Sequence, residues 1–127
     1  MRLAPVPAAI SDIRHYGPVS VVHADMMWAD ASDGWALIGD SGEVVPLWKP
    51  PAIEDDPRFR DFAAAHPQVL LWSDSIEWPD ARPIRNGGER LAFRFGLKTC
   101  HACARLGHAI VAYDFDARGR FLGAHLA

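Results

Sequence analysis

The chain has 127 residues, of which 50% are hydrophobic and 23% are charged, and its formal net charge is −3. This length fits a single domain with an ordinary apolar core. The composition excludes collagen, coiled coil and wholesale disorder, and the sequence has no apolar run of about 18 residues that could cross a membrane as a helix.

The charge is distributed unevenly along the chain. Residues 1–80 contain 13 acidic and 5 basic side chains, whereas residues 81–127 contain 3 acidic and 8 basic ones. Because the chain as a whole is acidic, we expect no nucleic-acid binding. The division favours either an electrostatic contact between the two halves or a basic protein partner.

The first half of the chain predicts one helix and three strands. Residues 7–16 carry apolar side chains near helical spacing and are expected to form a short helix. Residues 19–27 are rich in β-branched and apolar residues, which predicts a strand. Residues 35–38 and 44–48 flank a glycine-containing turn and predict a hairpin. Its second strand is expected at a sheet edge, because Pro46 has no N–H to donate.

A second short helix is expected to begin at Pro57, since proline is favoured in the first helical turn. Asp55 or Asp56 would provide its N-cap. The apolar side chains that follow recur at i, i+3 and i+4, which is typical of a helix with one buried face. Residues 68–72 predict a short strand, and residues 73–85 an irregular segment.

The last third of the chain predicts three strands. Residues 90–97 alternate, and their inward side chains are expected to be Leu91, Phe93, Phe95 and Leu97. Residues 108–114 and 120–126 predict two more strands, joined by a turn at residues 116–119. The predicted fold class is therefore α+β: one domain over residues 1–127, made of a mainly antiparallel sheet with two short helices.

The two cysteines belong to the motif Cys100-His101-Ala102-Cys103, between two predicted strands. Four interpretations are open: a redox pair, a zinc knuckle, a local disulfide, and ordinary packing of a strand connection. Zinc is the one cofactor that the motif suggests, with His101 or His108 as a third ligand. A second ligand pair is missing from the sequence, as is the βαβ context of a thioredoxin-like protein. The candidate metal or redox residues are Cys100, His101, Cys103 and His108.

A set of acidic and tryptophan residues in predicted turns suggests a surface for a basic partner. Solvation and helix capping are the simpler explanation for acidic turns, and most of the five tryptophans are expected in the core. Tryptophan is nevertheless enriched where proteins bind one another, and opposite potentials speed association. The candidate partner-binding residues are Trp28, Asp30, Asp33, Asp55, Asp56 and Trp78.

The basic residues of the second half are spaced to form a stripe along the predicted sheet. The stripe consists of Arg82, Arg85, Arg90, Arg94, Lys98 and Arg105. None of the short motifs typical of serine hydrolases, phosphate loops, dinucleotide-binding folds or zinc proteases occurs in the sequence. Enzymatic activity is left open by the sequence and is not favoured by it.

Residues 1–7 lack the apolar core of a signal peptide. As written, the sequence predicts a cytoplasmic protein, or a periplasmic one if a leader has been removed from it.

Residues 34–48 resemble a hairpin of small bacterial domains whose chemistry is uncharacterised. The matching residues are Gly34-Trp35-Ala36-Leu37, Asp40, Gly42 and Val45-Pro46-Leu47-Trp48. Some similar domains are immunity proteins that neutralise a toxin. The resemblance implies a small bacterial binding protein and assigns no functional residue.

The sequence thus favours a non-enzymatic bacterial protein that acts by protein–protein interaction, of the immunity type that neutralises a basic toxin. The alternative is a small metal- or thiol-dependent protein with a zinc or redox site at Cys100 and Cys103. A protein partner is expected, and nucleic acid and membrane are not. The oligomeric state is not predicted.

Overall fold

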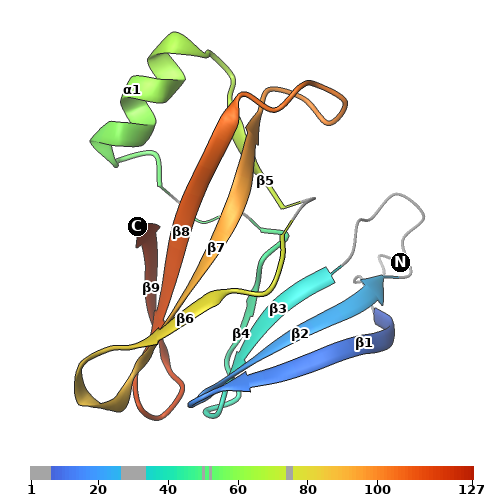
Figure 1. Ribbon diagram of the computed structural model, residues 1–127, viewed down its shortest axis with the longest axis vertical. Coiled ribbons are helices and arrows are strands. Elements are labelled where there is room, and N and C mark those ends of the chain that lie inside the picture. Colours follow the sequence, from blue (N-terminus) through green and yellow to red (C-terminus); the bar gives the residue numbers. More distant parts are fainter. Residues whose placement is uncertain (1–6, 27–33, 50, 52, 74–75) are drawn as a thin grey trace, which may run out of the picture.

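The computed structural model describes residues 7–26, 34–49, 51, 53–73 and 76–127, and two antiparallel sheets dominate it (Figure 1). Sheet A has the strand order β1-β2-β3-β4, so each strand pairs with its neighbour in sequence. Its strands are β1 (Pro7–Tyr16), β2 (Val19–Met26), β3 (Gly34–Gly39) and β4 (Val44–Pro46). The predicted hairpin is confirmed, and its short second strand, β4, lies at the edge of the sheet.

Sheet B is built around a long central strand, β7. It has the order β5-β7-β8-β9, and β6 also pairs with β7. Its strands are β5 (Leu70–Trp72), β6 (Asp80–Pro83), β7 (Glu89–Lys98), β8 (Gly107–Phe115) and β9 (Phe121–Leu126). β8 follows one edge of β7, while β5 and β6 share the other edge at opposite ends of the strand.

One α-helix, α1 (Pro57–Ala65), occurs in the part of the chain that the structure describes. Asp56 is its N-cap, and the Asp56 carboxylate accepts a 2.8 Å hydrogen bond from the backbone N–H of Arg58. The apolar face of α1 packs against the core through Phe59, Phe62 and Ala63. None of the described helical segments is long and apolar enough to span a membrane.

The prediction of a helix at residues 7–16 is wrong, because this segment forms β1. It turns back at Gly17, which has φ +57°, and pairs with β2 up to Tyr16 opposite Val19. Two register shifts interrupt the ladder and with it the alternation that marks a strand. Pairing with the β-branched β2 outweighs the weak helical tendency of the segment. The described ranges therefore contain one α-helix instead of the two expected, plus a 3-10 turn, η1 (Arg85–Gly87).

The segment 73–85 is also more regular than predicted, since it contains β6. Its four residues lack apolar alternation and show only partial burial. They are ordered by pairing with the nearby residues Glu89 to Ala92 in a short hairpin, and their own composition shows no strand pattern.

The core lies between the inner faces of the two sheets. Its largest fully buried side chains are Val19, Val21, Leu37 and Leu47 from the first half of the chain, and Leu91, Phe93, Phe95, Val111, Tyr113 and Phe115 from sheet B. The predicted alternation of β7 is confirmed, because all four predicted inward side chains are buried. The two sheets therefore share one core.

The turns after β1, β3 and β8 meet at the lower end of the molecule in Figure 1 and link the two sheets there. The backbone N–H of Asp40 donates to the Pro18 carbonyl at 2.8 Å, and the Ser41 hydroxyl donates to the Gly119 carbonyl at 3.0 Å. A Cβ atom on Gly39 would overlap the main chain of Gly119. Only glycine fits this contact, which we call the glycine joint.

Candidate functional site

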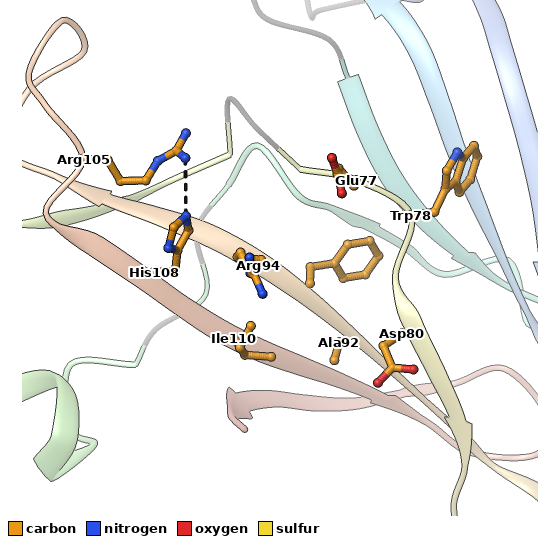
Figure 2. Close-up of a pocket in the computed structure, with 9 residues that line it drawn as sticks. Glu77, Trp78, Asp80, Ala92, Arg94, Arg105, His108 and Ile110 are labelled. Carbon is orange, nitrogen blue, oxygen red and sulfur yellow. Dashed lines mark hydrogen bonds between the residues drawn. The ribbon is translucent and has the colours of Figure 1, made fainter.

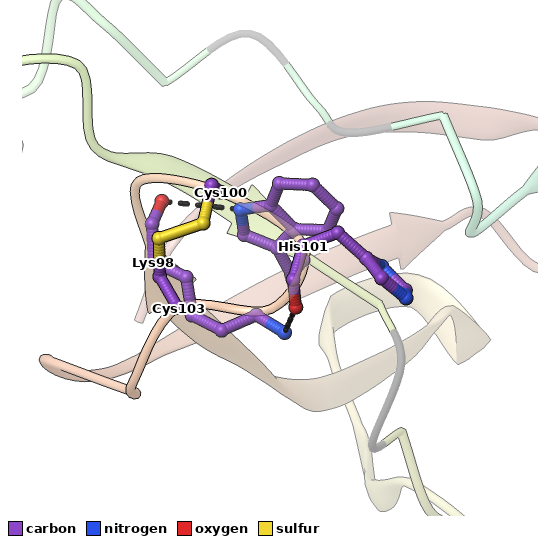
Figure 3. Close-up of a disulfide and its surroundings, with 5 residues drawn as sticks. Lys98, Cys100, His101 and Cys103 are labelled. Carbon is purple, nitrogen blue, oxygen red and sulfur yellow. Dashed lines mark hydrogen bonds between the residues drawn. A yellow bond between two sulfur atoms is a disulfide. The ribbon is translucent and has the colours of Figure 1, made fainter.

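The Cys-x-x-Cys motif forms an exposed turn between β7 and β8, in which the two cysteines are joined as a disulfide (Figure 3). The Cα atoms of Cys100 and Cys103 lie 5.0 Å apart, and the backbone N–H of Cys103 donates to the Cys100 carbonyl. Of the four interpretations open from the sequence, the structure places the pair in the local disulfide. Such a pair of sulfur atoms has no thiolate to offer a metal until it is reduced.

A buried lysine, Lys98, holds this turn through a hydrogen bond to its backbone. Lys98 is only 6% exposed, and its ammonium donates to the His101 carbonyl at 3.0 Å. The same ammonium lies 5.0 Å from the centre of the Trp72 ring, whose Nε1–H donates to the Lys98 carbonyl at 3.1 Å. The turn that carries the disulfide is therefore held in place by a buried ammonium group through the His101 carbonyl.

The two histidines of the candidate metal set lie in different surroundings. His101 is next to Trp72, with ring centres 5.8 Å apart, whereas His108 lies 3.4 Å from a guanidinium nitrogen of Arg105. Within the described ranges, no group of three or more His, Cys, Asp or Glu side chains is arranged to hold a metal ion. The described residues thus favour thiol–disulfide chemistry at this motif over zinc binding.

The structure describes only three of the six candidate partner-binding residues. Trp28, Asp30 and Asp33 lie outside the described residues. Asp55 is fully exposed before α1, while Asp56 is engaged as the N-cap, and the Arg58 side chain that bonds it lowers the pKa of its carboxyl.

Trp78 is partly buried. Its ring meets Trp35 edge-on with centres 4.9 Å apart, and the Arg14 guanidinium covers it at 4.1 Å. Trp78 thus packs against the shared core, in keeping with the core role expected of most tryptophans.

The predicted basic stripe is not continuous, because some of its arginines are paired with nearby carboxylates. Arg90 makes a two-pronged contact with Asp114, at 2.7 and 2.9 Å, and Arg82 pairs with Asp80 at 3.5 Å. Lys98 points to the Cys-x-x-Cys turn, as described above. Arg94 and Arg105 remain on the outer face of sheet B, where they line a pocket.

The sequence did not indicate an apolar groove of about 360 Å³ between the β4–α1 connection, α1 and β5. Trp48 and Leu70 line it and are 43% and 58% exposed, while Ile53 and Leu71 form its buried floor. Trp48 was expected at the end of a strand, but β4 ends at Pro46. The signal that could have identified the groove is the pair of large apolar residues beside proline-rich breaks in the strand pattern.

Comparison with known proteins found no matching family model, no related curated protein and no similar solved structure. Function is therefore inferred from the residues and their geometry.

Proposed function

We propose that this protein is a non-enzymatic binding protein that acts by protein–protein interaction, and that the apolar groove is where its partner binds. The observation that carries this proposal is the exposure of Trp48 and Leu70 in one groove. Large apolar side chains left in a concave site, with tryptophan among them, are typical of binding hot spots.

The groove lies wholly in the acidic half of the chain, which has 13 acidic and 5 basic residues. Glu54 lines the groove, and the fully exposed Asp55 follows it. We infer a partner with a basic surface, because opposite potentials speed association. A basic toxin neutralised by an immunity-type bacterial protein has this chemistry, and the resemblance at residues 34–48 supports that choice.

The decisive experiment captures the partner from a lysate of the protein's own cells and repeats the capture with variants. Trp48→Ala combined with Leu70→Ser removes both exposed anchors. Leu122→Ser is the matched control, since Leu122 is 62% exposed on β9, outside the groove. We expect the wild type and the control to retain the same partner and the double variant to lose it. Unchanged capture by the double variant, or no complex with the wild type, contradicts the proposal.

The basic nature of the partner is tested separately by association kinetics. Glu54→Lys with Asp55→Lys should slow association at low salt, whereas dissociation should change little. Asp56 is left unchanged because it caps α1. An association rate that does not respond to these charge reversals removes the electrostatic part of the proposal.

A second candidate function is thiol–disulfide chemistry at Cys100 and Cys103, favoured by the position of the disulfide in an exposed turn. In this step a dithiol reductant gives two electrons and two protons to the disulfide and is itself oxidised to a disulfide. A free-thiol count and elemental analysis of the native protein test it. Two unreactive free thiols without metal contradict both the redox and the zinc versions, and one equivalent of metal favours zinc.

A further inference from the structure

The outer face of sheet B, opposite the core, carries a pocket of about 610 Å³ (Figure 2). Its floor comes from β7 and β8, one wall from the segment that enters β6, and the far end from the loop between β7 and β8. This volume is within the usual range for sites that bind small molecules. The pocket belongs to neither the apolar groove nor the disulfide turn, so an inference from it is independent of the proposed function.

The charged groups of the pocket are separated by sign. Arg94, Arg105 and His108 lie toward one end, and Glu77 and Asp80 lie on the opposite wall (Figure 2). Most of these side chains project from strands or strand ends, which hold them more firmly than long loops would. The pocket therefore presents a positive end and a negative end to one bound molecule.

Arg105 is held in place by the shape of the strand beneath it. Its side chain crosses β7 at Gly96, where a Cβ atom would lie only 3.2 Å from the Arg105 Nε atom. One of its guanidinium nitrogens lies 3.4 Å from Nε2 of His108. The lack of a side chain at Gly96 thus lets Arg105 lie flat across the strand and border the positive end of the pocket.

Arg94 is the residue best placed to meet a ligand. It is exposed, and it makes no hydrogen bond or ion pair with any other residue that the structure describes. Arg90, four residues earlier on the same face of β7, is already held by the Asp114 carboxylate. A guanidinium that faces a pocket without such a partner is suited to bind a carboxylate with both of its arms.

The negative wall restricts the kind of anion that fits. Glu77 and Asp80 would repel a polyphosphate or a nucleic acid strand, while a molecule with an ammonium group would be attracted to them. Asp80 also pairs with Arg82 at 3.5 Å, but both side chains are largely exposed, so this contact is weak. The arrangement favours a ligand with one negative and one positive group.

We propose that this pocket binds a short peptide as a zwitterion, with the carboxylate at Arg94 and the ammonium between Glu77 and Asp80. The pocket is open on one side, so side chains of the peptide extend toward solvent over Ile110. Recognition depends on the two charged ends of the peptide, and binding involves no covalent step.

Titration calorimetry with the dipeptide alanyl-alanine tests the proposal on the intact chain. Its N-acetylated and C-amidated forms each lack one charge and should bind about tenfold more weakly or worse, as expected for loss of a charge-assisted hydrogen bond. Arg94→Gln should weaken the free dipeptide by a similar factor. Arg118→Gln, which removes an exposed arginine from the β8–β9 turn, should leave the affinity unchanged and is the matched control.

Four results would overturn the proposal. The first is no binding of the dipeptide at millimolar concentration, and the second is equal binding of the blocked and free forms. The third is an unchanged affinity in the Arg94→Gln variant with its fold intact by circular dichroism. The fourth is tighter binding of inorganic phosphate than of the dipeptide, which would make the pocket a simple anion site. Loss of the protein partner in the Trp48 and Leu70 variants affects none of these readouts.

Discussion

Sheet A and sheet B share one core but are assembled differently. In sheet A every strand pairs with its neighbour in sequence, and β1 at the edge has a single partner and two register shifts. In sheet B the central strand β7 is bordered on both edges and alternates in burial from Leu91 to Phe95, while its last residues, Gly96 to Lys98, are all buried. A strand that is paired on both sides therefore shows its pattern in the sequence, whereas an irregular edge strand can be mistaken for a helix.

The largest effect is expected from removing a core side chain in either sheet. Phe95→Ala in sheet B should lower the free energy of unfolding by about 4 kcal/mol, and Leu37→Ala in sheet A by about 3 kcal/mol. Both residues are fully buried in the shared core. Urea denaturation measures the loss, and hydrogen exchange should show both sheets opening together. Independent opening of sheet A would contradict a single core.

The glycine joint gives the next largest effect. Gly119 has φ +80°, and a Cβ atom there would overlap the backbone N of Asp40, so Gly119→Ala should cost about 3 kcal/mol. Gly42→Ala is the matched control, because Gly42 has φ +93° but nothing within 4 Å of an added Cβ. The control should cost about 1 kcal/mol in the same urea titration. Equal losses would mean that the close approach between the sheets adds nothing.

The two acidic residues before α1, Asp55 and Asp56, should differ in their effect on stability, and both effects are smaller than those above. Asp56→Ala should lower the free energy of unfolding by about 1 kcal/mol, because it removes the N-cap. Asp55→Ala should be close to neutral, since Asp55 is fully exposed and its 3.6 Å ion pair is with Arg60, which is itself largely exposed. Thermal unfolding of the two variants measures the difference, and a reversed order would contradict the assigned cap.

Replacing Tyr113 of sheet B is expected to stabilise the fold. The Tyr113 hydroxyl is buried without a hydrogen-bond partner among the described residues, and burial raises the pKa of its phenol. Tyr113→Phe should therefore raise the free energy of unfolding by about 1 kcal/mol. A loss of stability in urea would show that the hydroxyl has a bound partner, such as an ordered water.

The smallest expected effect is on how the stability of the fold changes at acidic pH. The pKa of Asp116 is lowered, first by the backbone N–H of Arg120 and also by the Arg120 side chain and the Arg118 N–H. A lowered pKa in the folded state means that this contribution is complete above the ordinary value of 3.8 and is lost as the pH falls through the folded value. Asp116→Asn should flatten the acid end of the stability–pH curve. The exposed Asp61→Asn is the control.

Local patterns predicted much of the fold. The alternation around Phe93, the glycine turn before β4 and the capped start at Pro57 each depend on residues close in sequence, and all are confirmed. The helix expected at residues 7–16 and the irregular segment expected at residues 73–85 are corrected to strands, because β1 and β6 depend on pairing partners.

The candidate site was less accessible to sequence reasoning. The Cys-x-x-Cys turn was located correctly, but its support by the buried Lys98 and Trp72 was not anticipated. The groove at Trp48 and the pocket at Arg94 each collect residues from three or more separate segments. Such sites form only when the sheets are assembled, so the sequence offers at most the large apolar residues beside proline-rich breaks as a signal for the groove, and none for the pocket.

The glycine joint also determines where the molecule tolerates new sequence. Turns that touch through bare main chain leave no room for an added residue, so inserted tags or grafted loops should be rejected at the end where Gly39 meets Gly119. The turn between β7 and β8, at the other end of the molecule in Figure 1, is exposed and leaves room for a change in length. The two ends of the molecule should thus differ in whether they tolerate inserted residues.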